Sequence, residues 1–330
     1  MPKTRKRILT GDRPTGSLHL GHYVGSLKNR VKLQDEYESY IIIADVQALT
    51  THWEKGESLY QSVMQIASDY LAAGLDPNKV TIFIQSMIPE IHELTMYFSM
   101  FTSVNVLRHN PTIKTEAAQH GFSEITYGFL GYPVSQAADI TIFKADLVPV
   151  GEDQIPHIEF ARKIVRRFNE LYAPVLVEPQ AMVGEVPRLI GLDGQAKMSK
   201  SLNNAIYLCD SPEEVNKKVW NAVTDPARIH KNDPGHPEVC TVFAYHQIFN
   251  PQEVSAIEID CRQGNIGCVA CKKNLAHKIN QLLAPMHERR QKYSPDDIKD
   301  ILREGTLRAH AVAKETMEEV REAMKIAYFK

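Results

Sequence analysis

The sequence contains no apolar run that approaches the roughly 20 residues a membrane-spanning helix needs. Its basic first residues, 1–7, are not followed by the apolar stretch of a secretion signal. An excess of one charge is also lacking, since 38 Lys and Arg against 40 Asp and Glu leave a net charge of −2. These absences argue against a membrane-spanning protein and against indiscriminate coating of nucleic acid, although basic patches remain at residues 162–167 and 289–292. We therefore expect a cytoplasmic protein.

The composition is that of an ordinary soluble protein: 330 residues, 43% hydrophobic and 24% charged, enough for one large domain and a smaller one. Strand-like and helix-like segments alternate in the first part of the chain, which predicts an α/β fold with a doubly wound parallel sheet. The strand candidates are residues 7–10, 40–44 and 80–85, and the helix candidates begin at Leu20 and Ser58.

Ligands of such sheets bind beyond the carboxyl ends of the strands. The loops at residues 11–16, 45–50 and 151–154 are expected to meet there.

Two short strings carry the strongest functional signal, His19-Leu20-Gly21-His22 and Lys197-Met198-Ser199-Lys200-Ser201. Either string alone has an ordinary interpretation, as histidines at a helix start or as a solvated basic loop. Together, and in this order, they resemble the paired signatures of class I aminoacyl-tRNA synthetases.

The surroundings of the first string suit phosphate chemistry, because a strand, a tight loop and a helix follow one another there. The start of a helix offers unpaired N–H groups and the positive end of the helix dipole, which favour a triphosphate. Gly21 and Gly25 have no side chains, so a flat base could approach closely to that face of the helix. His19 and His22 are expected to donate hydrogen bonds to phosphate oxygens.

A longer stretch identifies the family more closely. Residues 132–140 read Tyr-Pro-Val-Ser-Gln-Ala-Ala-Asp-Ile and residues 148–154 read Val-Pro-Val-Gly-Glu-Asp-Gln. Both resemble the tryptophanyl-tRNA synthetase family, and the resemblance extends from residues 11–16 to residues 304–306, over nearly the whole chain.

This resemblance implies a Rossmann-like, doubly wound catalytic domain at residues 1–205 and an α-helical anticodon-binding domain at residues 206–330. It implies a tryptophan–tRNA ligase, which activates L-tryptophan with ATP to tryptophanyl-adenylate and pyrophosphate. The enzyme then transfers tryptophan to the 3′-terminal ribose of tRNA(Trp). A symmetric homodimer is also implied, with residues 89–122 as its expected interface.

The expected tryptophan pocket depends on the carboxylate of Asp139. Indole has one donor, its N–H, and a carboxylate in an apolar slot accepts that hydrogen while rejecting phenylalanine. The resemblance gives Asp139 this role, and the ordinary alternative is an aspartate on a helix surface. Tyr132 and Gln154 match family positions that bind the ammonium group or line the pocket. Gln47 and Gln136 depart from the histidine and methionine often found at their positions, and the second glutamine is similar to the sister tyrosyl enzymes.

For ATP, the resemblance implies residues from four parts of the chain: Arg13, Pro14, Thr15, Gly21, His22, Gly151, Glu152, Asp153, Leu189, Lys197, Met198, Ser199, Lys200 and Ser201. Attack of the tryptophan carboxylate on the α-phosphorus develops charge on the phosphate oxygens, so preorganised cations and N–H groups do most of the catalysis. The expected catalytic residues are His19 and His22, with Lys197 and Lys200 on pyrophosphate. Mg²⁺ is expected as the partner of ATP, without a dedicated protein cage.

Four of the five cysteines follow the pattern Cys240-x20-Cys261-x6-Cys268-x2-Cys271. Soft thiolates at such spacing in a cytoplasmic protein suggest an iron–sulfur cluster or a tetrahedral metal site rather than disulfides. Residues 266–273 resemble a branch of the family that carries a [4Fe–4S] cluster, in which the first gap is about two residues longer. We expect this cluster, with Zn²⁺ as one alternative and four unliganded thiols as another.

The chain from about residue 211 is predicted to be helical, with helices at residues 212–223, 275–292, 295–302 and 306–328. Lys272, Lys273 and Lys278 lie beside the cysteines. They could meet RNA phosphates or stacked bases, or merely keep a helix soluble.

Two other functions stay open from the sequence. Gln47 and Gln136 are compatible with tyrosine activation. The cysteines are compatible with an iron–sulfur regulatory or nucleic-acid-binding protein that has kept a synthetase fold and lost charging, although two intact signature strings argue against lost chemistry.

Overall fold

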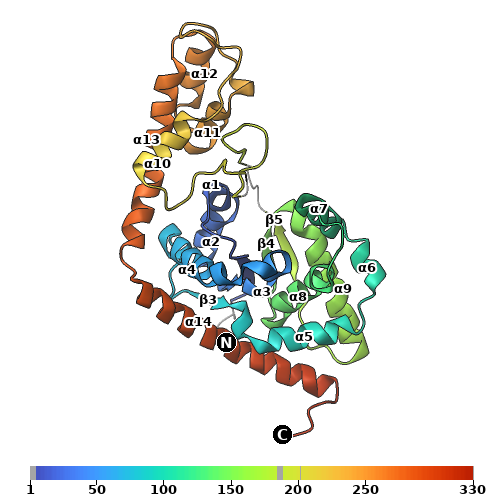
Figure 1. The fold of residues 1–330 in the computed structure, drawn as a ribbon. Coiled ribbons are helices and arrows are strands. Elements are labelled where there is room, and N and C mark those ends of the chain that lie inside the picture. Colours follow the sequence, from blue (N-terminus) through green and yellow to red (C-terminus); the bar gives the residue numbers. More distant parts are fainter. Residues whose placement is uncertain (1–4, 184–188, 201, 330) are drawn as a thin grey trace.

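The computed structural model describes residues 5–183, 189–200 and 202–329, and a parallel sheet lies at its centre (Figure 1). β1 (Arg7–Asp12) lies in the middle, with β2 (Glu38–Ile43) and then β3 (Val80–Ile84) on one side. β4 (Leu147–Val150) and then β5 (Gln180–Val183) lie on the other side, and all neighbours pair in parallel. The chain winds outwards from β1 in both directions, which confirms the predicted doubly wound α/β fold.

Strand β2 is buried on both faces. Tyr40 and Ile42 pack into one core layer, while Ile41 and Ile43 pack into the other. A strand covered on both faces needs apolar side chains at every position, so this segment reads as a continuous apolar run rather than an alternation.

Helices from distant parts of the chain cover the two faces of the sheet. The first core layer includes side chains of α5 (Pro89–Ser99), α8 (Tyr127–Ile142) and α9 (Ile155–Leu171). The second includes α4 (Gly56–Ala73) and part of α13 (Cys268–Arg290).

The other helical segments of the first 183 residues are short. The helix predicted from Leu20 forms as α1, η1 and α2 in direct succession, and η1 is a π-helical stretch. Their bounds are α1 (Leu20–His22), η1 (Tyr23–Leu27), α2 (Lys28–Leu33), α3 (Asp45–His52), η2 (Trp53–Lys55), η3 (Gln85–Met87), α6 (Val104–Arg108), α7 (Pro111–His120) and η4 (Glu152–Gln154).

A helical lobe projects from the sheet at the top of Figure 1. It contains α10 (Pro212–Trp220), η5 (Pro237–Val239), α11 (Thr241–Phe249), α12 (Val254–Arg262) and most of α13. The predicted domain boundary after residue 205 stays a prediction. Beside it, Ile206 and Leu208 are fully buried, and their backbones are hydrogen-bonded to Leu20 and Leu18 of the first domain.

The last helix, α14 (Pro295–Ala323), is continuous, so the predicted interruption at residues 303–305 is wrong. Gly305 lies inside α14 where the helix backbone packs directly on β3, and a Cβ on this residue would lie 1.9 Å from the carbonyl oxygen of Ile82. Glycine here permits close packing rather than ending the helix. α14 runs along the underside of the sheet domain (Figure 1), and Ala309, Ala313 and Met317 belong to its core.

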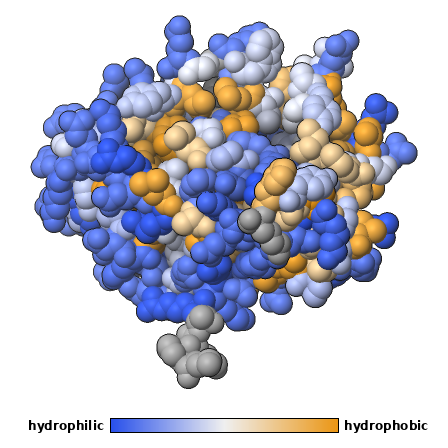
Figure 2. Space-filling view, turned by 90° about the horizontal axis from the view of Figure 1, so that it is seen from below, coloured by the Kyte–Doolittle hydropathy of each residue, from blue (hydrophilic) through white to orange (hydrophobic). Residues whose placement is uncertain are grey.

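Seen from below, the surface is mostly hydrophilic, with apolar residues gathered towards the right, the side on which Figure 1 places α5 and α6 (Figure 2). No helix within the described ranges is long and apolar enough to cross a membrane.

Candidate active site

A cavity of about 460 Å³ opens at the carboxyl ends of β1 and β4, where the strand order reverses. This is the position at which doubly wound sheets bind ligands. The loops expected to meet here do so, since residues of all three line the cavity. The lining comprises Leu9, Thr10, Gly11, Asp12, Arg13, Thr15, His22, Arg30, Ile42, Ala44, Gln47, Glu116, Tyr132, Gln136, Asp139, Ile140, Val148, Pro149, Val150, Gly151, Gln154 and His157.

Helix α8 presents Asp139 to this cavity, and the residue is only 3% exposed. Gln85, directly after β3, donates from Nε2 to both carboxylate oxygens at 2.8 and 3.0 Å. Burial raises the pKa of Asp139 to about 7, although the hydrogen bond from Gln85 acts in the opposite direction. The carboxylate is therefore held in one orientation, and a donor from a ligand would favour its charged form.

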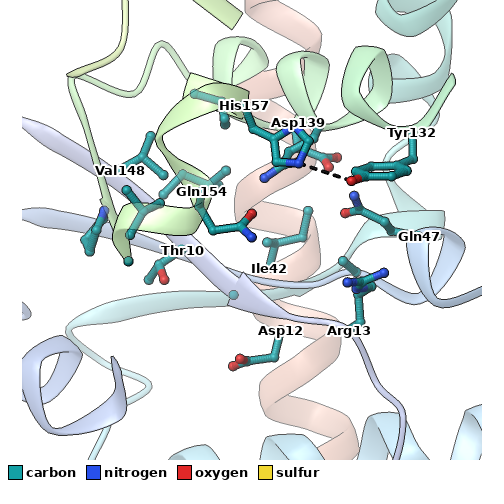
Figure 3. Close-up of a pocket in the computed structure, with 18 of the residues that line it drawn as sticks. Thr10, Asp12, Arg13, Ile42, Gln47, Tyr132, Asp139, Val148, Gln154 and His157 are labelled. Carbon is teal, nitrogen blue, oxygen red and sulfur yellow. Dashed lines mark hydrogen bonds between the residues drawn. The ribbon is translucent and has the colours of Figure 1, made fainter. Parts of the chain in front are cut away.

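The structure brings all five predicted tryptophan-pocket residues to this one cavity. The hydroxyl of Tyr132 lies 3.1 Å from Nε2 of His157, close to Asp139 (Figure 3). Gln47 and Gln154 approach from opposite sides in the same view, and Gln136 also lines the cavity.

Several polar residues belong to the site although no motif marks them, among them Gln85, Glu116 and His157. Gln85 ends the predicted strand at residues 80–85, so its place at the carboxyl end of a strand was a usable signal. Glu116 and His157 lie within α7 and α9 and reach the cavity only through the packing of those helices.

The two histidines of the first motif are neutral. Burial, followed by the nearby positive charges, lowers the pKa of His19 to about 2. Burial also lowers the pKa of His22 to about 4, against the opposing effect of Asp12. The backbone N–H of His19 donates to Nδ1 of His22 at 3.2 Å, which leaves Nε2–H of His22 as its donor. In the ligand-free protein, these lowered pKa values make both rings hydrogen-bond donors rather than cations.

Gly21 lies beneath the His19 ring. A Cβ on Gly21 would lie 2.9 Å from Nδ1 of His19 and 3.6 Å from Cβ of Met198. The absence of a side chain thus allows the first motif to pack against the second.

Backbone pairing and a side-chain hydrogen bond hold the second motif beside the first. His19 forms a β-bridge with Tyr207, and Nζ of Lys200 donates to the carbonyl oxygen of Gly16 at 2.5 Å. Met198 is buried, whereas Lys197 is exposed. Ser199 donates its backbone N–H to Asn204, and Ser201 lies outside the described residues.

A buried ion pair lines the same cavity. Nη1 of Arg30 lies 2.6 Å from Oδ2 of Asp12, and the hydroxyl of Tyr70 donates to the same oxygen at 2.8 Å. Burial alone would raise the pKa of Asp12, but Arg30 and the other partners lower it to about 2. A carboxylate already neutralised in this way does not repel a bound phosphate as an unpaired one would.

The remaining residues expected to bind ATP divide into two groups. Arg13, Thr15 and Gly151 line the cavity. Pro14, Glu152 and Leu189 do not: Pro14 and Leu189 are buried, and Glu152 is exposed. The backbone of Asp153 lies in η4, and its side chain is outside the described part of the structure.

Cys240, Cys261, Cys268 and Cys271 line one small cavity of about 20 Å³ in the helical lobe. Burial raises the pKa of Cys271 to about 12, and the neighbouring thiols add to this effect. No three His, Cys, Asp or Glu side chains in the described ranges are arranged to hold a metal ion. The thiols converge as the pattern predicts, but the expected iron–sulfur cluster gains no support from this arrangement.

Comparison with known proteins distinguishes between the functions that the sequence left open. Residues 1–284 match the family model described as tRNA synthetases class I (W and Y). A tryptophan–tRNA ligase of Lactococcus lactis subsp. lactis is 51% identical, covering 99% of this chain and all of that protein. One from Streptococcus agalactiae serotype V is 50% identical with the same coverage.

Solved structures agree with these relatives. Tryptophanyl-tRNA synthetase from Campylobacter jejuni, complexed with ADP and tryptophan, superimposes with a TM-score of 0.87 at 33% identity, covering 97% of this chain and 99% of that one. A tyrosyl-tRNA synthetase from Archaeoglobus fulgidus, complexed with tyrosine, shares the fold at 21% identity, with a TM-score of 0.66 over 88% of this chain and 91% of that one.

Proposed function

The chain belongs to the class I tRNA synthetases for tryptophan and tyrosine, and we propose that it acts as a tryptophan–tRNA ligase, using the cavity between β1 and β4. The reaction first joins L-tryptophan and ATP to form tryptophanyl-adenylate and pyrophosphate, and then esterifies the 3′-terminal ribose of tRNA(Trp). The observation that carries the choice of amino acid is Asp139, a buried carboxylate presented to the cavity. The relatives that are about half identical over the whole chain are tryptophan–tRNA ligases.

The pocket suits an indole. Asp139 offers an acceptor for the single indole N–H, and its oxygens are held by Gln85. Ile42 and Val148 form an apolar wall of the cavity against which the ring can pack. Phenylalanine would leave the buried carboxylate without a ligand donor, which is the kind of loss that gives strong discrimination.

Catalysis of activation requires charge stabilisation rather than a covalent intermediate. The tryptophan carboxylate attacks the α-phosphorus, the bond to pyrophosphate breaks, and negative charge grows on the departing oxygens. Lys197 and Lys200 neutralise that charge, and the neutral rings of His19 and His22 donate hydrogen bonds. Mg²⁺ bound to ATP would supply further positive charge to the triphosphate. Asp12 is already paired with Arg30.

The test of this function is amino-acid-dependent ATP–pyrophosphate exchange, with tryptophan and tyrosine compared on protein purified without oxygen. Exchange with tryptophan alone is expected, and the purified protein should then charge tRNA(Trp). We propose that the cellular reaction takes place in the cytoplasm, where ATP and tRNA meet. Exchange with tyrosine at comparable kcat/KM would refute the choice of substrate. No exchange with either, on folded protein, would favour the regulatory alternative.

The helical lobe is the proposed tRNA-binding part. Two of the three lysines considered for RNA contact are engaged within the protein: Lys278 lies 2.6 Å from Glu253, and Lys272 donates to the carbonyl oxygen of Trp220 at 2.7 Å. Lys273 is exposed and is the best placed of the three for a phosphate.

We further propose that the four converging thiols bind a metal centre, with a [4Fe–4S] cluster as the expected occupant and Zn²⁺ as the alternative. Cys240 caps α11, Cys261 lies in α12, and Cys268 and Cys271 lie in the first turn of α13. A thiolate-bound centre would join three helices of the lobe and so stabilise a surface for tRNA. Metal and acid-labile sulfide analysis of protein purified without oxygen separates the two occupants from bare thiols.

If the centre serves tRNA binding, Cys268→Ser should lower the rate of tRNA charging about tenfold or more and leave ATP–pyrophosphate exchange nearly unchanged. Cys209→Ser is the matched control, because Cys209 lies outside the cluster. Equal losses in both reactions would contradict this role.

Dimerisation is proposed through residues 89–122. This part of the surface exposes large apolar side chains, among them Met96 (55%) and Met100 (71%), and such patches commonly mark association sites. Met100→Glu should convert a dimer to a monomer in analytical ultracentrifugation. Met87→Glu, at a methionine of similar exposure (61%) outside residues 89–122, should leave the mass unchanged. A monomeric wild-type protein would contradict the proposal.

A further inference from the structure

A third carboxylate lines the cavity besides those of Asp139 and Asp12. Glu116, from α7, has a side chain that is only 15% exposed. Its Oε1 lies 3.0 Å from Nη2 of Arg13, which also lines the cavity and is 36% exposed. Neither signature string contains Glu116, and the reaction described above does not use it.

The other oxygen of this carboxylate lacks a donor. Oε2 of Glu116 is buried and accepts no hydrogen bond from the residues that the structure describes. Burial, then the charge of Glu116 and a side-chain hydrogen bond with it, raise the pKa of Tyr132, so the carboxylate lies beside that hydroxyl. A buried carboxylate oxygen without a donor costs free energy, which a ligand donor can recover.

The other acidic groups of the lining are already assigned. Asp12 is neutralised by Arg30 and Tyr70. Asp139 is held by Gln85 and faces the part of the cavity that suits the indole. Glu116 is thus the carboxylate in the described lining that keeps a buried oxygen without a hydrogen-bond donor.

An α-amino acid presents two opposite charges next to each other. With its ring at Asp139 and its carboxylate directed towards ATP, tryptophan must place its ammonium group between these ends, near Tyr132 and Arg13. An ammonium group has three N–H donors and gains most from an ionised acceptor in a site shielded from water.

We infer that Glu116 is the counter-ion of the substrate's α-ammonium group, beside Tyr132, and that it also holds Arg13 where the guanidinium meets the substrate carboxylate. The Arg13–Glu116 ion pair thereby recognises the zwitterion, while Asp139 recognises the ring. This inference rests on the proposed function, because it requires an amino acid in this cavity.

The test pairs one substitution with ligands that lack one charge each. Inhibition or dissociation constants are measured for tryptophan, tryptamine, which has the ammonium group alone, and 3-indolepropionate, which has the carboxylate alone. Glu116→Gln should weaken tryptophan and tryptamine by about 10- to 100-fold, as expected for a lost charge-assisted hydrogen bond. Binding of 3-indolepropionate should stay within about threefold or tighten.

Controls separate this role from a structural one. Glu178→Gln removes another ion-paired carboxylate, the partner of Arg166 outside the cavity, and should change none of the three constants. Equal weakening of all three ligands by Glu116→Gln, or a rise in KM for ATP alone, would overturn the inference in favour of a purely structural role. If Glu116→Gln does not fold, Glu116→Asp must weaken the binding of tryptophan and tryptamine by a smaller factor and leave the binding of 3-indolepropionate nearly unchanged. Wild-type protein that does not bind tryptophan would refute the proposed function instead.

Discussion

Replacing Lys200 by methionine should lower kcat for tryptophan-dependent ATP–pyrophosphate exchange by about 10²- to 10³-fold, the usual cost of removing one transition-state charge partner. The ammonium group of Lys200 is held against the carbonyl oxygen of Gly16, in the loop between β1 and α1. Burial lowers the pKa of Lys200, and a partly buried cation interacts with phosphate more strongly than one in bulk water. The KM for tryptophan should change little, because Lys200 does not line the tryptophan cavity.

Two further variants show whether the loss reflects charge or loop structure. Lys197→Met removes an exposed lysine of the same motif and should also lower kcat, without disturbing the bond to Gly16. Lys217→Met removes an exposed lysine from α10 and should leave exchange unchanged. An unchanged kcat in both motif variants would contradict a role for this loop in pyrophosphate departure.

Replacing Asp139 by asparagine should raise the KM for tryptophan by about 10²-fold or more, because a site built to accept a hydrogen bond loses strongly when the pairing fails. The new amide N–H₂ would also face the Nε2–H₂ of Gln85, a donor against a donor. In wild-type protein, tryptophan should bind far better than an analogue in which sulfur replaces the indole N–H. This preference should largely disappear in Asp139→Asn, and its persistence would show that another group reads the ring.

The same carboxylate predicts a pH dependence. The pKa of Asp139 in the ligand-free protein is raised to about 7, and an indole N–H bonded to the carboxylate favours the ionised form and lowers this pKa in the complex. Binding of tryptophan therefore releases a proton. Affinity should fall by up to about tenfold per pH unit as the pH drops below about 7, and level off above it. Titration calorimetry from pH 5.5 to 8 measures this, and Asp139→Asn should flatten the profile.

Much of the site could be predicted from short segments of sequence. The strands that frame it are apolar runs, the loops that form it follow those strands, and all five expected pocket residues line one cavity. Local sequence was less informative in α14, which was predicted as two helices at residues 295–302 and 306–328. Gly305 lies within the continuous helix, where it lets the helix backbone pack on the backbone of β3, more than 200 residues away along the chain.

The sequence by itself determined which chemical groups are available to this protein: two strings predicted to bind phosphate, in the expected order, one aspartate predicted to accept from an indole, and four cysteines at a spacing typical of metal sites. Only the tertiary structure decided how these groups are charged and partnered. His19 and His22 are neutral because they are buried, and Asp139 is held by Gln85. Glu116 reaches the cavity from a helix that carries no motif. Burial and contacts between distant segments arise from packing of the whole chain, so no local pattern encodes them.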